Sequence, residues 1–160
     1  MTDVKKPTLY ILCGLPGSGK TTYAKILENA ETVRFTLDAE LFEKYGKYFP
    51  SDKYEEYETQ TKRIILKKTS SVIRDGKSVI LDWGFWKRSE RDDIKRFAED
   101  NGADWQLSYF KCQKDDLMKR ILNRQMDENH AISEKMMRDF INDFEEPSDE
   151  GEKIIDCGKD

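Results

Sequence analysis

A glycine-rich segment near the start of the chain limits its possible folds more than any other feature. Residues 14–21 read Gly-Leu-Pro-Gly-Ser-Gly-Lys-Thr and match the pattern G-x-x-x-x-G-K-[ST] at every fixed position. An apolar run at 8–13 precedes the pattern, and a segment with helical spacing at 20–30 follows it. A strand, a glycine turn and a helix in this order present backbone N–H groups and the positive end of the helix to a phosphate. The segment therefore predicts a nucleotide site, and its flanks argue against a chance turn.

The chemistry of a nucleoside triphosphate gives the side chains of this segment separate roles. Lys20 is expected to reach the β- and γ-phosphates, and the hydroxyl of Thr21 to bind Mg²⁺. ATP and Mg²⁺ are accordingly the expected cofactors. The residues predicted to contact the nucleotide are Gly14, Leu15, Pro16, Gly17, Ser18, Gly19, Lys20, Thr21 and Thr22.

Strand-like and helical patterns alternate along the whole chain. Strands are expected at 8–13, 32–37, 78–81, 105–110 and 153–155. Helical spacing and capping residues predict helices at about 20–30, 38–46, 52–76, 89–102, 115–127 and 133–147. This alternation predicts a parallel α/β sheet, whose ligands bind at the carboxyl ends of the strands. Residues directly after each strand are therefore the candidates for function.

Length and charge narrow the class of protein. The 160 residues suffice for one domain, so 1–160 is expected to fold as a single unit. A net charge of −4 and a pI near 5.3 give no overall positive field for nucleic acid, although a local basic groove stays compatible with them. No apolar run approaches ~18 residues, so we expect neither a signal peptide nor a membrane span. These features favour a cytoplasmic enzyme or binding domain.

The few cysteine and histidine residues argue against two kinds of stabilising site. Cys13, Cys112 and Cys157 are odd in number and widely spaced, which disfavours a disulfide framework and favours a reducing compartment. His130 is the only histidine, so a zinc site built from Cys and His has almost no ligands available.

Two acidic residues stand where strands end. Asp38 follows the strand at 32–37, where its carboxylate would accept the proton of an attacking hydroxyl or bind the acceptor. A simple helix N-cap is the alternative for Asp38, and both roles can hold at once. Asp82 ends the apolar run 79–81 and is predicted to hold the Mg²⁺ water shell, with a turn-initiating Asp as its alternative.

Two arginines lie four residues apart in the helix expected after the fourth strand. Arg120 and Arg124 share one helical face, from which two guanidinium groups would clamp a triphosphate as charge develops during transfer. A solvated charged face is the alternative, because the same helix carries Asp115, Asp116 and Lys119.

An aromatic loop follows Asp82. Trp83, Phe85 and Trp86 lie within four residues, with Arg88 close behind. Aromatic rings beside a crevice can stack on a planar or sugar-like acceptor, so these four residues are predicted to contact the substrate. Core packing under a lid is the alternative for the rings.

Together these residues resemble the group of small P-loop kinases that includes chloramphenicol phosphotransferase, zeta-type toxins and the polynucleotide 5′-hydroxyl kinase domain. The resemblance covers nearly the whole chain, through 14–21, Asp38, 79–82 and the pair Arg120 and Arg124. It implies a three-layer α/β/α P-loop NTPase fold with a five-stranded parallel sheet and a helical lid at about 115–132. It also implies transfer of the γ-phosphate of ATP to a hydroxyl, with Asp38 as general base and both arginines on ATP.

The acceptor is where this chain departs from part of that group. Polynucleotide kinases usually carry arginine three residues after the catalytic acid, and here that residue is Leu41. With the acidic pI, this favours a small-molecule hydroxyl as acceptor, bound by a monomer or weak dimer. One alternative is a polynucleotide 5′-hydroxyl kinase, whose positive groove would draw on Lys44, Lys47, Lys53 and Arg88. Another is a nucleotide-dependent ATPase or switch with water as acceptor, which Asp38 disfavours.

Overall fold

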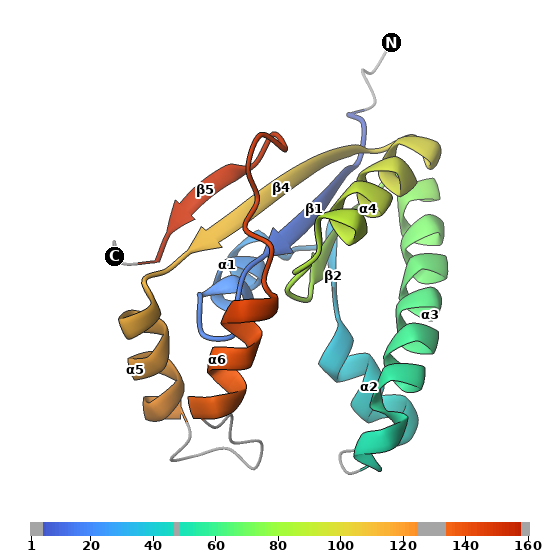
Figure 1. The fold of residues 1–160 in the computed structure, drawn as a ribbon. Helices are drawn as coiled ribbons and strands as arrows, with labels where there is room; N and C mark the ends of the chain where they lie inside the picture. The colour runs from blue at the N-terminus through green and yellow to red at the C-terminus, as the bar shows by residue number, and fades with distance from the viewer. Residues whose placement is uncertain (1–4, 47–48, 125–133, 158–160) are drawn as a thin grey trace.

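Five parallel strands form the central sheet of the protein. The computed structural model of the chain describes residues 5–46, 49–124 and 134–157, apart from the side chains of Ser51 and Arg124. The strands are β1 (Thr8–Cys13), β2 (Thr32–Thr36), β3 (Ser78–Asp82), β4 (Asp104–Lys111) and β5 (Lys153–Asp156). Their order across the sheet is β2-β3-β1-β4-β5, and every neighbouring pair is parallel (Figure 1). The predicted parallel α/β architecture is confirmed.

Helices connect these strands in the predicted order. They are α1 (Lys20–Leu27), α2 (Leu37–Tyr45), α3 (Tyr54–Arg74), α4 (Arg88–Asp100), α5 (Lys114–Arg124) and α6 (Glu134–Asp143), with a 3₁₀ turn at Ser51–Lys53 before α3. Helix α1 ends three residues earlier than predicted, because the backbones of Asn29 and Thr32 exchange hydrogen bonds in a tight turn into β2.

Alternating side chains of the strands supply two apolar layers, one on each face of the sheet. Leu9 and Ile11 of β1 belong to the larger layer, into which α3 and α4 insert Ile65 and Ile94. Leu12 points to the opposite face, where α1 covers it. The result is the three-layer α/β/α arrangement that the resemblance implied.

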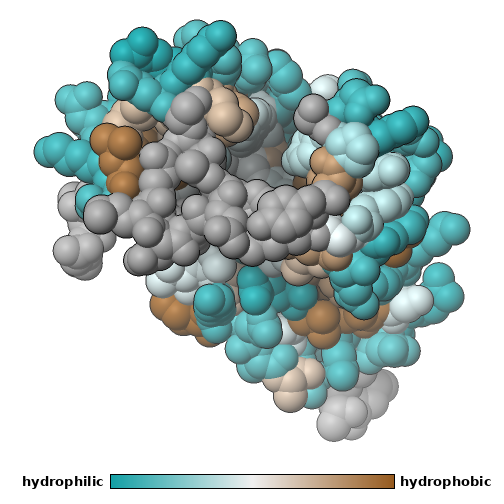
Figure 2. All heavy atoms as spheres, turned by 90° about the horizontal axis from the view of Figure 1, so that it is seen from below, coloured by the Kyte–Doolittle hydropathy of each residue, from teal (hydrophilic) through white to brown (hydrophobic). Residues whose placement is uncertain are grey.

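The carboxyl ends of the central strands meet at one edge of the sheet. Ile11 pairs with Leu81, and Thr36 pairs with Asp82, so β1, β3 and β2 end side by side. Figure 2 views the molecule from below, the side toward which the strands point in Figure 1. Around the atoms drawn in grey, hydrophilic side chains prevail on this face, and hydrophobic ones gather in patches.

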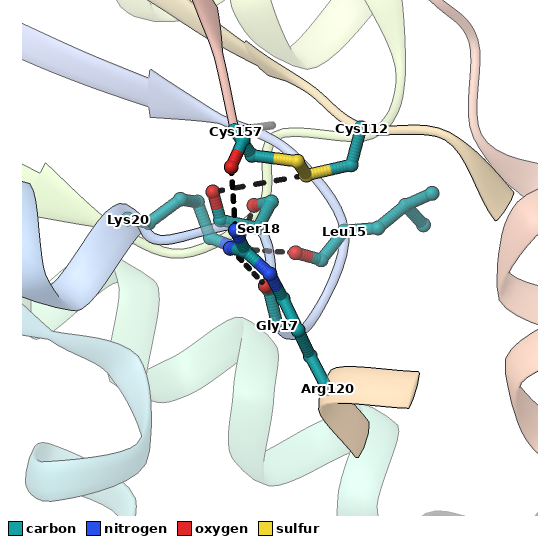
Figure 3. Close-up of a disulfide and its surroundings, with 7 residues drawn as sticks. All are labelled: Leu15, Gly17, Ser18, Lys20, Cys112, Arg120 and Cys157. Atoms are coloured by element: carbon teal, nitrogen blue, oxygen red, sulfur yellow. Dashed lines mark hydrogen bonds between the residues drawn. A yellow bond between two sulfur atoms is a disulfide. The ribbon is translucent and has the colours of Figure 1, made fainter. Parts of the chain in front are cut away.

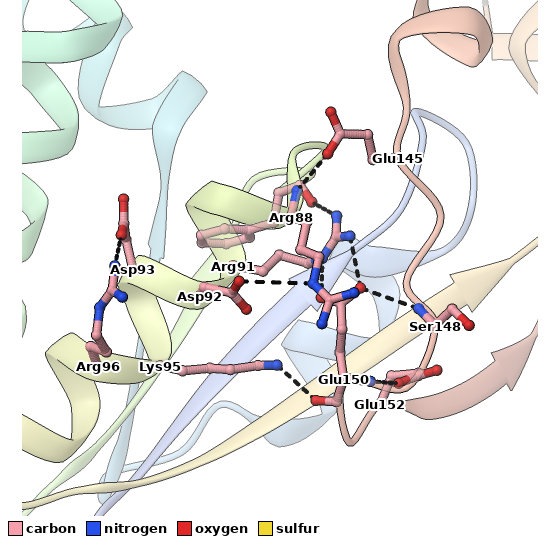
Figure 4. A network of polar contacts seen from close by, with 11 residues as sticks. Arg88, Arg91, Asp92, Asp93, Lys95, Arg96, Glu145, Ser148, Glu150 and Glu152 are labelled. Carbon is pink, nitrogen blue, oxygen red and sulfur yellow. Dashed lines mark hydrogen bonds and ion pairs between the residues drawn. The ribbon is translucent and has the colours of Figure 1, made fainter.

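A buried ion pair ties the segment after α6 to α4. Arg91 is fully buried, and its Nε and Nη2 atoms donate to the two carboxylate oxygens of Glu150 at 2.8 and 3.0 Å (Figure 4). Its Nη1 donates to the carbonyl oxygen of Phe85 at 2.8 Å. Burial, the largest influence, raises the pKa of Glu150, but hydrogen bonds from Arg91 and from the N–H of Ser148 hold it below its ordinary value.

Glu150→Gln is expected to lower the free energy of unfolding by about 3–5 kcal/mol at neutral pH, because it leaves the Arg91 charge buried without its partner. A depressed folded-state pKa gives stability that is present above the unfolded pKa of about 4.3 and is lost as the pH falls through the folded pKa. The difference between variant and parent should therefore shrink in acid. Urea unfolding at several pH values measures it.

Glu145→Gln is the matched control for that experiment. Glu145 accepts from the N–H of Arg88 but is exposed, so its replacement should lower the free energy of unfolding far less than Glu150→Gln does. Equal decreases in the free energy of unfolding for the two variants would show that burial of the Arg91–Glu150 pair makes its loss no more costly than that of an exposed contact.

The cysteines correct one expectation from the sequence. A disulfide joins Cys112 and Cys157, whose Cα atoms are 5.3 Å apart, whereas the odd count and wide spacing argued against disulfides. The two residues are 45 positions apart in the chain, and only the pairing of β4 with β5 brings them together. Within the described ranges, no helix is long and apolar enough to cross a membrane.

Candidate active site

The loop between β1 and α1 has the backbone that its glycines predict. Gly17 and Gly19 have φ values of +84° and +99°, a region that side chains other than glycine rarely adopt. Gly14 is needed for space, because a Cβ atom there would lie 2.7 Å from the Oγ atom of Ser18. We refer to residues 14–21 as the phosphate loop.

Lys20 begins α1 and folds back over the phosphate loop. Its Nζ atom donates to the carbonyl oxygen of Leu15 at 2.9 Å and lies 3.5 Å from the Oγ atom of Ser18. Its charge also acts on the end of β3, because burial raises the pKa of Asp82 and Lys20 partly opposes this rise. The side chain thus lies inside the loop that is predicted to hold the phosphates.

The residues predicted to hold Mg²⁺ meet in the structure. The hydroxyl of Thr21 donates to Oδ2 of Asp82 at 3.2 Å, and the Asp82 side chain is almost fully buried. Burial raises the pKa of Asp82, while Lys20, the Thr21 hydrogen bond and Arg34 lower it. A buried carboxylate whose ionised form is disfavoured gains from a cation placed beside it.

This pair fits a magnesium ion that completes its shell with water and phosphate oxygens. Mg²⁺ binds through one or two protein oxygens together with substrate phosphates, so it needs no all-protein cage. Within the part of the chain that the structure describes, no group of three His, Cys, Asp or Glu side chains is arranged to hold a metal ion. Thr21 and Asp82 would be the protein's contribution to such an ion.

Asp38 is the second residue of α2, directly beyond the edge where Asp82 ends β3. The N-cap of α2 is Thr36, whose Oγ1 accepts from the N–H of Ala39 at 3.2 Å, so Asp38 is not the cap that the sequence offered as its alternative role. The Asp38 side chain is exposed. Burial, then Glu58, and then the charge of Asp38 raise the pKa of Tyr54 at the start of α3, so Asp38 acts electrostatically on that end of α3.

Arg120 reaches the phosphate loop from α5. Its Nη1 donates to the carbonyl oxygen of Gly17 at 3.2 Å, and its Nη2 donates to the carbonyl oxygen of Cys157 (Figure 3). The alternative for Arg120 was a solvent-exposed position on a charged helical face. Its guanidinium instead donates to two backbone carbonyl groups, so this alternative does not apply. The side chain of Arg124 and most of the predicted lid, residues 125–132, lie outside the described residues.

The aromatic loop after Asp82 packs in the core. Trp83 and Phe85 are only 8% and 1% exposed, and their stacked rings belong to the larger apolar layer. Rings buried to this degree have no exposed face on which an acceptor could stack. Core packing, the alternative from the sequence, therefore describes Trp83 and Phe85. Trp86 packs on Phe140 and donates from Nε1 to the carbonyl oxygen of Gly14 at 3.3 Å, so it contacts the first residue of the phosphate loop.

Arg88, also predicted to contact the substrate, is exposed at the start of α4. Its guanidinium lies 3.8 Å from Asp92, and its N–H donates to Glu145 at 3.0 Å. These contacts are local to α4 and to the segment after α6, and none of them joins Arg88 to the phosphate loop.

One cation at the site was not predicted from the sequence. Arg34 of β2 lies between Glu28, at 2.8 Å from its Nε, and Asp82, at 3.8 Å from its Nη1. It therefore adds positive charge beside the predicted magnesium ligand. The sequence does show a charged residue inside the predicted strand at 32–37. Only the order of the strands, with β2 beside β3, shows that this residue lies near Asp82.

The fold and this edge of the sheet define the chain as a P-loop nucleotide-binding protein. Residues 9–147 match the family AAA_33, described as an AAA domain, and the chain belongs to this family.

Solved structures with the same fold include several kinases. A protein from Chloroflexus aurantiacus assigned as a kinase superposes with a TM-score of 0.77 at 18% identity, over 97% of this chain and 87% of that one. A gluconokinase from Sinorhizobium meliloti 1021 gives 0.67 at 16% identity, over 98% and 86%. A chain of the Pnkp1/Rnl/Hen1 RNA repair complex gives 0.73 at 22% identity, over 86% of this chain but only 43% of that longer chain. The chain thus has the fold of P-loop kinases.

Proposed function

We propose that the protein is a kinase that transfers the γ-phosphate of ATP to a hydroxyl group of a small molecule. The main support is the arrangement at one edge of the sheet, where the phosphate loop, the Thr21–Asp82 pair and Asp38 follow three adjacent strands. A site for a triphosphate, a site for its metal and a carboxylate that is not needed as a helix cap are the parts that such a transfer requires.

Each part has a defined task in the proposed reaction. The backbone N–H groups of the phosphate loop and the Lys20 ammonium bind the β- and γ-phosphates, and Thr21 and Asp82 hold the magnesium ion. The magnesium ion supplies charge that neutralises the phosphate oxygens. Asp38 orients the acceptor hydroxyl and accepts its proton as the oxygen attacks phosphorus. Arg120 adds positive charge at the rim of the loop.

The surroundings of Asp38 favour an acceptor that is not a polyanion. Residues 37–46 and 51–58 carry two lysines, Lys44 and Lys53, against seven carboxylates: Asp38, Glu40, Glu43, Asp52, Glu55, Glu56 and Glu58. Lysines pair with three of these carboxylates, namely Glu40, Glu56 and Glu58. The carboxylates still outnumber the lysines, so a chain of phosphates approaching this side would meet an excess of like charge. Leu41, at the position where polynucleotide kinases usually carry arginine, is 1% exposed and cannot contact an acceptor.

A polynucleotide 5′-hydroxyl kinase is the second candidate, supported by the likeness to a chain of an RNA repair complex. Of the lysines expected to line its groove, Lys44 and Lys53 are exposed, and Lys47 lies outside the described residues. Lys53 is paired with Glu56 at 3.7 Å, which reduces its value for binding phosphate.

Transfer of labelled phosphate from ATP separates the two candidates. We expect a panel of small hydroxyl compounds to include an acceptor whose phosphorylation changes little between low and high salt. A 5′-hydroxyl oligonucleotide should accept little phosphate, and a 5′-phosphorylated oligonucleotide of the same sequence is its control. Efficient labelling of the 5′-hydroxyl oligonucleotide alone, falling steeply with salt, would reject the small-molecule proposal because polynucleotide binding depends on phosphate neutralisation. Release of phosphate to water alone would instead support the ATPase or switch alternative.

A further inference from the structure

The disulfide between Cys112 and Cys157 lies against the phosphate loop. Cys112 is in the connection from β4 to α5, and Cys157 follows β5. The Sγ atom of Cys112 is 4.0 Å from the carbonyl oxygen of Ser18 (Figure 3). Both cysteines are half-buried, so neither residue is closed off from solvent as a core residue is.

Arg120 connects this disulfide to the loop. One guanidinium nitrogen donates to the carbonyl oxygen of Cys157 and another donates to that of Gly17 (Figure 3). The disulfide holds Cys157 near the start of α5, the helix that carries Arg120. In the oxidised protein, one N–H of each terminal guanidinium nitrogen of Arg120 is therefore donated to a carbonyl group of the protein itself, which fixes the position of the guanidinium.

We propose that Cys112 and Cys157 form a reversible thiol–disulfide site that weakens the binding of ATP when it is oxidised. This inference rests on the ATP site of the proposed function. Oxidation keeps the carbonyl group of Cys157 beside Arg120 and holds the guanidinium on the carbonyl oxygens of Cys157 and Gly17. Reduction leaves Cys157 attached only through the pairing of β5 with β4, so Arg120 can exchange the carbonyl oxygen of Cys157 for a phosphate oxygen.

A low-molecular-weight disulfide such as oxidised glutathione is the class of oxidant that this site would take. The thiolate of one cysteine attacks a sulfur atom of the reagent, which forms a mixed disulfide and releases one glutathione thiolate. The second cysteine thiolate attacks the protein sulfur of the mixed disulfide and releases the second glutathione. Two electrons pass from the protein to the reagent, and the two protons of the cysteine thiols go to the released thiolates.

The remaining cysteine provides an internal contrast. Cys13 is fully buried at the end of β1, and burial raises its pKa to about 12. Thiol–disulfide exchange requires a thiolate that the reagent can reach. Cys13 is neither accessible nor readily ionised. Oxidation is thus directed to Cys112 and Cys157.

The test compares ATP·Mg²⁺ binding to the protein after treatment with dithiothreitol or with oxidised glutathione. Alkylation of free thiols followed by peptide mass measurement shows which cysteines are paired in each sample. We expect the dissociation constant for ATP·Mg²⁺ to be at least about tenfold higher in the oxidised sample, because a charge-assisted contact from Arg120 is lost. Equal dissociation constants in the two samples would overturn the proposal.

Three variants identify the groups responsible. Cys112→Ser should bind ATP·Mg²⁺ like the reduced parent under both treatments, whereas Cys13→Ala should keep the redox response. Arg120→Ala should bind weakly in both states with no redox response, and a full response in this variant would contradict the role given to Arg120. A redox-dependent dissociation constant in a protein that phosphorylates no acceptor would support the disulfide site and reject only the kinase activity.

Discussion

Asp38→Asn is expected to slow phosphate transfer to the acceptor by about 10²- to 10⁴-fold while ATP·Mg²⁺ binds with almost unchanged affinity. The amide is nearly the same size as the carboxylate but cannot accept a proton. The helix should not be disturbed, because Thr36 rather than Asp38 caps α2. Transfer kinetics and ATP titration on the same preparation measure the two quantities separately.

Asp100→Asn is the matched control for this variant. Asp100 is an exposed carboxylate at the end of α4, and it belongs to none of the segments that form the candidate site. Its replacement should leave the transfer rate and the affinity for ATP·Mg²⁺ unchanged. If Asp38→Asn transfers phosphate at the parent rate, Asp38 is not the general base. If it loses ATP binding as well, the acid supports the nucleotide site instead.

Lys20→Ala should lower the transfer rate by about 10²- to 10³-fold, the effect typical of removing one donor that stabilises charge in the transition state. The fold should persist, because the Lys20 side chain lies over the phosphate loop and does not pack in either apolar layer. Single-turnover transfer from labelled ATP measures the rate, and circular dichroism checks the fold.

Lys25→Ala offers a control on the same helix. Lys25 is exposed in the last turn of α1, so its loss removes one positive charge from the same element without touching the loop. Parent-like transfer by Lys20→Ala, or an equal loss in Lys25→Ala, would show that the phosphate loop does not work through Lys20.

Local patterns in the sequence were sufficient for the sheet and for the phosphate loop. The loop is a continuous pattern whose glycines set its backbone, and β1 was predicted at its observed bounds, Thr8–Cys13. The meeting of Thr21 with Asp82 also followed, because the phosphate loop that leads to Thr21 follows β1, and Asp82 ends β3, the parallel neighbour of β1. These features depend on short segments and on one general rule about parallel sheets.

The features that were missed depend on contacts between distant segments. The pairing of Cys112 with Cys157 required the position of β5 beside β4, which spacing alone does not give. For Trp83 and Phe85 the sequence left core packing and substrate contact both open, because the choice depends on which way a loop turns after its strand. Arg91 did leave a signal, since it shares a helical face with the buried Ile94 and Ala98, but its partner Glu150 is 59 residues away.

That separation has a consequence for how the protein is made. During synthesis Arg91 leaves the ribosome well before Glu150 does. Until Glu150 has been made, the Arg91 guanidinium lacks this carboxylate as its partner for burial. The three strands β1, β2 and β3, whose carboxyl ends lie at the candidate site, can associate earlier because all of them precede Arg91 in the chain. The buried pairing of α4 with Glu150 forms only after the segment that follows α6 has been made. Chaperones that bind nascent chains would therefore meet a protein whose nucleotide-binding edge is assembled before its interior is sealed.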